Sequence, residues 1–258
     1  MAITEEAREQ AEPGTARTRR ARPSARLTGR RLLAAIPVLF VVRESPRRVV
    51  RAAVPRTMDV LRAAAPGTIG ALAVLIAAQG LQQTSYAAAQ ALVVLRLLQL
   101  TGAADAKPLT GITFAIAGIA TALASLTYSR LLRRTSYRAV ITIGAVLMGL
   151  ALFGSGLARN PAMLVAAFVI GSFFSGALIP AFGAMIGLEA PSIVQATVFG
   201  VSSSSISLGF GLGPLLGGFV ASAAGVQTGL MTAGVLALAQ AALVGIASRE
   251  PKPPQRLA

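Results

Sequence analysis

The sequence predicts an all-α membrane protein with six transmembrane helices. Three observations predict it. The chain of 258 residues is 54% hydrophobic with a mean hydropathy of +0.69, its apolar residues gather in six long segments, and the connections between these segments are short. A spanning helix needs about 20 apolar residues, and each segment is near or above that length. The six segments are 66–95, 109–128, 139–157, 162–186, 194–223 and 229–247.

The distribution of Arg and Lys predicts the orientation of these segments. One side of the membrane would carry the N-terminal region, the connection 129–138 and the tail 248–258, where basic residues are frequent. The other side would carry mainly Lys107 and Arg159. Because basic residues concentrate in cytoplasmic loops, both termini are predicted to be cytoplasmic in a multi-pass protein of the cell (plasma) membrane. The connection 187–193 should also be cytoplasmic, although it has no basic residue.

The remaining segments have distinct compositions. Residues 1–31 are polar and Arg-rich and contain no apolar run, so we expect them to be disordered. Residues 32–65 hold an apolar run too short to span a membrane, followed by a basic, mildly amphipathic connector. The predicted domains are therefore these two segments, the bundle over 66–247 and the cytoplasmic tail over 248–258.

Composition excludes several classes of function. The chain has no Cys, His or Trp, so we expect no disulfide, no metal site built on thiolate or imidazole, and no cofactor. No Asp or Glu falls within the six segments, which argues against an acid/base enzyme and places any proton-coupling carboxylate outside them. The net charge of +15 allows a nucleic-acid-binding N-terminus as an alternative. Residues 1–31 lack aromatic side chains for base stacking, so no nucleic-acid partner is predicted.

A run of small residues marks the fifth apolar segment. Residues 209–218 read G-x-x-x-G-P-x-x-G-G, and residues four apart share one face of a helix. Such a face lets another backbone approach closely in lipid, and the proline favours a kink. The residues of this predicted packing motif are Ser205, Gly209, Gly213, Pro214, Gly217 and Gly218, and Ala221 extends the small face.

This motif resembles the signature of the major facilitator superfamily, best known from its drug:proton antiporter branches. A second match lies between the second and third segments, where residues 128–138 look like a degraded copy of the family's cytoplasmic loop. Arg133 stands where that loop has Asp, and Ser136 stands where it has Gly. In the family's N-terminal half, the fourth helix carries an Arg three residues before a Gly, whereas here Phe168 precedes Gly171.

The resemblance implies half of a major facilitator fold, its C-terminal helices seven to twelve. Residues 32–65 would then hold the end of helix six and the central loop, and the chain would be a fragment. The implied function is half of a secondary transporter that exports small, drug-like molecules by alternating access. Its partners would be the lipid bilayer, the substrate, and the missing six-helix half or a second copy, and part of the surface facing the small-residue groove would be absent. The alternative is a truncated, transport-inactive remnant or partner subunit.

Polar residues in the first segment are candidates for the substrate cavity. They recur at three- and four-residue spacing, so they share one helix face, and amide side chains avoid lipid. Helix seven borders the cavity in the resembling family. The alternative is hydrogen bonding between helices without a ligand. The candidates are Gln79, Gln82, Gln83, Tyr86 and Gln90.

Three further features have less specific interpretations. Arg96 could meet an anionic substrate, but we expect its side chain to extend to the membrane interface. The cytoplasmic basic loop, with Arg130, Arg133, Arg134 and Arg138, is expected to set topology and to contact lipid head groups. Phe173 and Phe174 could contact an apolar drug, but packing is the default for aromatic residues in a membrane helix.

Overall fold

The computed structural model describes Asp59, residues 67–131 and residues 135–248, except for the side chains of residues 129–131. The predicted disordered segment and the 32–65 segment, apart from Asp59, lie outside the described residues. So does the tail after Ser248. The described chain is helical throughout, which confirms the all-α class.

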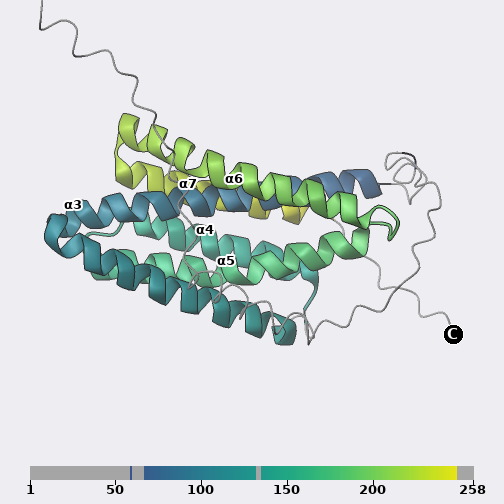
Figure 1. The fold of residues 1–258 in the computed structure, drawn as a ribbon, viewed down its shortest axis with the longest axis horizontal. Coiled ribbons are helices and arrows are strands. Elements are labelled where there is room, and N and C mark those ends of the chain that lie inside the picture. Colours follow the sequence, from purple (N-terminus) through teal and green to yellow (C-terminus); the bar gives the residue numbers. More distant parts are fainter. Residues whose placement is uncertain (1–58, 60–66, 132–134, 249–258) are drawn as a thin grey trace, which may run out of the picture. The chain divides into compact units, whose positions relative to one another are not determined.

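Five helices follow one another along the described chain (Figure 1). All five are long and apolar enough to cross a membrane. Local sequence explains two of their starts: Ser136 accepts a hydrogen bond from the Ala139 backbone at the start of α4, and Asn160 accepts one from Met163 just before Pro161 opens α5. The helices are α3 (Thr68–Leu131), α4 (Tyr137–Gly156), α5 (Pro161–Glu189), α6 (Gln195–Ala224) and α7 (Val226–Ala247).

Helix α3 covers the first two predicted segments. Its backbone is interrupted at Gly102, where φ is 78° and ψ is 173°. A positive φ is readily adopted by glycine, and Figure 1 shows the chain reversing direction within α3. We call residues 68–101 the first arm and residues 103–131 the second arm. The connection predicted over 96–108 is wrong in extent, because both arms continue helically almost to the glycine.

Several other helix ends also run further than predicted. The last residue of α5 is Glu189, which the sequence placed in a loop, and Asp105 lies in the second arm rather than in a connection. Only Gly225, with φ of 91°, separates α6 from α7. Membrane helices extend beyond their apolar centres because polar residues at their ends can reach water, so hydropathy alone underestimates helix length.

Helix α3 holds the bundle together. It packs against α5, α6 and α7, while α4 packs against α5 and α7. The side chains between them are fully buried and include Leu75, Met148, Leu152, Phe168 and Phe182. Large apolar side chains also cover the outside, where Leu126 is 74% exposed and Ile246 is 85% exposed. A helical bundle that is apolar inside and outside is a membrane protein.

Candidate functional site

The small residues of α6 pack against the first arm of α3. A Cβ atom built on Gly209 would lie 2.6 Å from the Gly80 carbonyl oxygen, and one built on Gly213 would lie 2.6 Å from the Thr84 carbonyl oxygen. These distances are shorter than any real Cβ contact, so only glycine allows the two backbones to come this close. We call Ser205, Gly209, Gly213, Gly217 and Ala221 the glycine face of α6.

Hydrogen bonds and reciprocal small residues extend this contact. The Ser205 hydroxyl donates to the Ile76 carbonyl at 2.9 Å. On the opposing helix Gly80 faces Ser205, because a Cβ at position 80 would lie 2.3 Å from the Ser205 hydroxyl oxygen. Gly217 lies against Ala88 and Leu92. The expectation that part of this groove's partner is absent from the chain is therefore wrong: the first arm of α3 covers its glycines.

Two residues of the predicted motif lie on the other side of α6. Pro214 and Gly218 are exposed, and nothing lies within 4 Å of a Cβ built on Gly218. Helix α6 continues from Gln195 to Ala224 without interruption at Pro214. The motif G-x-x-x-G-P-x-x-G-G therefore divides between two faces of one helix.

Hydrogen bonds between side chains join the first arm of α3 to α5, and we call this row of polar contacts the polar seam. The Gln82 amide donates to the Ser175 hydroxyl at 3.0 Å, and the Tyr86 hydroxyl donates to the Ser172 hydroxyl at 3.1 Å. The Tyr86 ring also stacks on Phe168, with ring centroids 6.0 Å apart. Three candidates for the substrate cavity lie elsewhere: Gln79 accepts from Ser202 of α6, Gln83 touches Gly209, and Gln90 is half-buried.

Four of the five candidates therefore contact one of two neighbouring helices. Gln79 and Gln83 lie toward α6, whereas Gln82 and Tyr86 lie toward α5. Gln79, Gln82 and Gln83 are at most 5% exposed, and each lies in contact with a neighbouring helix. Tyr86 and Gln90 are the two that keep part of their surface accessible.

Sequence reasoning overlooked the part of α5 that completes this polar seam. Ser172 also accepts, through its backbone carbonyl, from the Thr121 hydroxyl at 3.1 Å. The Ser125 hydroxyl donates to the Gly176 carbonyl at 2.9 Å, and a Cβ on Gly176 would lie 2.4 Å from the Thr121 carbonyl oxygen. The signal was present in the small residues Gly171, Ser172, Ser175 and Gly176, but the bulky Phe173 and Phe174 between them drew attention to aromatic contacts.

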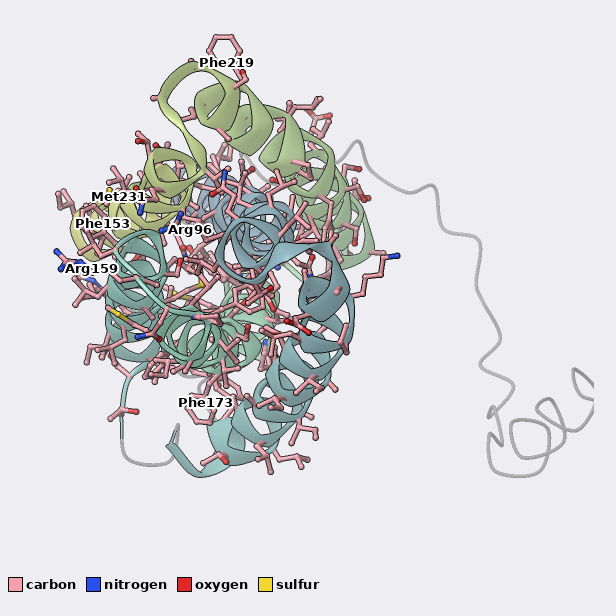
Figure 2. The ribbon with its side chains drawn as sticks, turned by 90° about the vertical axis from the view of Figure 1, so that its left-hand side faces the viewer. Arg96, Phe153, Arg159, Phe173, Phe219 and Met231 are labelled. Atoms are coloured by element: carbon pink, nitrogen blue, oxygen red, sulfur yellow. The ribbon has the colours of Figure 1, made fainter. Side chains whose placement is uncertain are left out.

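Arg96 has a structural role. One terminal nitrogen donates to the Ala158 carbonyl at 3.0 Å, just beyond the end of α4, and the other donates to Gln99 at 3.2 Å. A cation at a helix C-terminus satisfies free carbonyls and interacts favourably with the helix dipole. Ala158 lies in the connection between α4 and α5, at one end of the spans, so the extension of this side chain to the membrane interface stays a prediction. Figure 2, which views the helices end-on, shows Arg96 between them.

The predicted basic loop lies only partly within the described residues. Arg133 and Arg134 and the side chain of Arg130 lie outside them. Arg138 donates to the Gly245 carbonyl near the end of α7. This contact again places a cation near a helix C-terminus, so Arg138 joins the start of α4 to the end of α7.

Among the described residues, no three His, Cys, Asp or Glu side chains are grouped to hold a metal ion. The acids in the described part of the chain are Asp59, Asp105 and Glu189. Phe173 and Phe174 meet edge to face with centroids 5.4 Å apart, and Phe173 is 37% exposed.

Long apolar helices joined by small residues and by hydroxyl and amide contacts define a multi-pass integral membrane protein. A family profile described as Major Facilitator Superfamily matches residues 72–258. The chain belongs to this superfamily of membrane transporters.

Individual relatives match over shorter stretches. Quinolone resistance protein NorA of Staphylococcus aureus (strain MRSA252) is 35% identical over 82 residues, which cover 32% of this chain and 21% of NorA. The uncharacterized MFS-type transporter YuxJ of Bacillus subtilis (strain 168) is 30% identical over 153 residues, 59% of this chain and 39% of YuxJ. The matches therefore span well under half of either relative's length.

A solved structure shares the fold. A bacterial homolog of the human lysosomal transporter Spinster, crystallised in an inward-facing, unoccupied conformation, superposes with a TM-score of 0.60 at 18% identity. The match covers 73% of this chain and 44% of that one. At this level of identity the similarity establishes the fold alone.

Proposed function

We propose that the chain is the C-terminal six-helix half of a secondary transporter in the cell membrane, with both termini cytoplasmic. The break at Gly102 supports counting α3 as two spans, which with α4 to α7 makes six. The coverage of less than half of the related solved transporter supports the proposal that a second unit is required.

The transport mechanism we propose is alternating access, in which two rigid bundles rock about a central site. The observation that carries this proposal is the close contact between α6 and the first arm of α3, at glycine backbones. Because the closest approaches in that contact are to backbone atoms, which have no rotamers to change, the two helices would move as one body. A rigid half is what rocking requires.

The substrate class we propose is small, drug-like molecules. The support is the partial similarity to a protein named for quinolone resistance. Tyr86 and Gln90 are the proposed substrate contacts, because both are half-buried polar residues on the first arm. The other three candidates would act mainly by holding neighbouring helices together beside the substrate contacts; they are Gln79, Gln82 and Gln83. Any carboxylate that couples transport to protons would lie on the partner unit.

The outward side of α6 is the proposed contact for that partner. Small residues recur along it at helical spacing, and Cβ atoms built on its glycines would meet nothing within 4 Å. The partner would be the missing N-terminal half or a second copy of this chain. We call this side the outward face; its small residues are Gly200, Ser204, Ser207, Gly211, Gly218 and Ser222.

The alternative is a truncated, transport-inactive remnant or a partner subunit. This alternative is supported by the limited matches, which cover 21% of NorA and 39% of YuxJ. It predicts a folded bundle without transport under any pairing.

Reconstitution tests the two proposals. The chain is placed in proteoliposomes alone and together with the N-terminal half of a related transporter, and uptake of a fluoroquinolone is measured. We expect uptake with the added half, and its reduction by Tyr86→Ala at unchanged protein level. Folded protein with no uptake in either preparation would favour the remnant.

A further inference from the structure

An apolar pocket of about 170 Å³ lies between the second arm of α3, α4 and α5. Its walls include Tyr128 from α3, Ile143 and Leu147 from α4, and Phe173 and Ala177 from α5. A dry apolar cavity of roughly 150 Å³ accepts a benzene molecule. The pocket therefore has room for a ring or for several methylene groups.

The pocket opens on the outer side of the bundle. Its rim residues Ile143, Leu147 and Phe173 are 57%, 37% and 37% exposed, and Figure 2 shows Phe173 at the outer edge. The neighbouring Leu126 of α3 is 74% exposed. In a chain embedded in a bilayer, this surface meets acyl chains. The proposed substrate contacts lie elsewhere, because Tyr86 packs against Ser172 and Phe168.

The pocket lies near one end of the membrane spans. Tyr128 is followed by Ser129 and Arg130 and so ends the apolar stretch of α3, and Thr135, which also lines the pocket, precedes α4. Tyrosines at such positions commonly lie at the level of the lipid head groups. Tyr128 is 8% exposed, and its hydroxyl has no hydrogen-bond partner among the described residues. The hydroxyl oxygen is itself buried, so an acceptor in the pocket reaches it only if the Tyr128 ring turns toward the pocket. Because an unpaired hydroxyl in apolar surroundings is unfavourable, that contact would be stabilising.

We propose that this pocket binds an acyl chain of a membrane phospholipid, whose ester carbonyl accepts a hydrogen bond from the Tyr128 hydroxyl. The methylene groups would fill the space between Ile143, Phe173 and Ala177. The hydrophobic effect contributes little to the binding free energy, because the acyl chain moves into the pocket from lipid and not from water. Dispersion contacts with the pocket walls hold the chain, and the hydroxyl favours ester lipids over others.

Photolabelling tests occupancy. The full chain is reconstituted in vesicles containing an ester phosphatidylcholine with a diazirine on one acyl chain, and labelled peptides are mapped. We expect labels on residues 139–147 and 173–177, and their loss in Ala177→Leu, which fills the pocket. Ala166→Leu is the matched control, because Ala166 is an exposed alanine of the same helix outside the pocket lining; it should label like wild type.

A second variant covers the case in which Ala177→Leu does not fold. Ala139→Leu fills the same pocket from α4 and should also lower labelling. Labelling unchanged in a folded Ala177→Leu protein, or in Ala139→Leu if the first does not fold, overturns the proposal. So does displacement of the label by a fluoroquinolone, which would show that the pocket takes drug-like molecules instead.

The hydroxyl contact has its own test. An ether analogue of the same diazirine lipid lacks the ester carbonyl, so it should label wild type more weakly than the ester lipid does. In Tyr128→Phe the two lipids should label equally. Equal labelling by both lipids in the wild type would overturn the hydrogen bond. Because the readout involves no transport, a failure of the transport proposal would leave this result unaffected.

Discussion

The two faces of α6 differ in what surrounds their glycines. On the glycine face, Gly209 and Gly213 lie so close to the first arm of α3 that a Cβ would approach a backbone oxygen to 2.6 Å. On the outward face, Gly211 and Gly218 have nothing within 4 Å. The same residue type, a few positions apart, is required in one place and unconstrained within this chain in the other. The role of a glycine in a membrane helix therefore depends on which atoms lie beside it.

The largest effect should come from a large side chain on the glycine face. In Gly213→Leu, the leucine must displace the Thr84 backbone and Ala87, so we expect destabilisation at or above the roughly 1–3 kcal/mol of an overpacked core. Gly218→Leu is the matched control and should be neutral or stabilise the chain by up to about 1 kcal/mol through helix propensity. Unfolding in mixed micelles measures both. Equal stability of the two variants would show that the glycine face is no more sensitive to a large side chain than the outward face.

A single methyl group should give the next largest effect. Gly209→Ala places its Cβ against the Gly80 carbonyl and the Gln83 side chain, and we expect a loss of about 1–3 kcal/mol. Gly211→Ala, two residues along, should be neutral or stabilise by up to about 1 kcal/mol through helix propensity. Thermal unfolding of the two purified variants gives the comparison. A Gly209→Ala protein as stable as wild type would mean that α3 can move away from α6 at little cost.

The outward face should matter only when a partner is present. Gly211→Leu should not destabilise this chain, but it should reduce co-purification with an N-terminal half, because the larger side chain prevents close approach of another helix. The measurement is the yield of the tagged partner recovered with each variant. Recovery equal to wild type would indicate that this face contacts lipid rather than protein.

The smallest effect should come from the serines. Ser205→Ala removes a hydroxyl that bonds across the interface to the Ile76 carbonyl, and such bonds contribute about 0.6 kcal/mol in membrane proteins. Ser204→Ala removes a hydroxyl that bonds only to Gly200 of its own helix, so no measurable loss of stability is expected. A double-mutant cycle with a second substitution at Gly80 would show whether the Ser205 effect belongs to the interface.

Sequence patterns predicted the elements well and the contacts less well. Hydropathy located the helices, because a run of apolar residues long enough to span lipid has few other stable conformations. It missed the helical continuation on either side of Gly102, since Asp105 and Lys107 there lower local hydropathy. The spacing of the α6 glycines indicated a close-packed face, whereas the contact between Arg96 and the Ala158 carbonyl was not predicted, because the two residues are 62 positions apart in sequence.

The sequence by itself determined that the chain is a helical membrane protein and that α6 carries small residues at helical spacing, because both follow from local composition and period. Only the tertiary structure decided which glycines contact α3 and which face outward, and which polar residues of the first arm meet α5 or α6. Those choices depend on how neighbouring helices are arranged. Helix period identifies a face, but only packing of distant segments determines what that face touches.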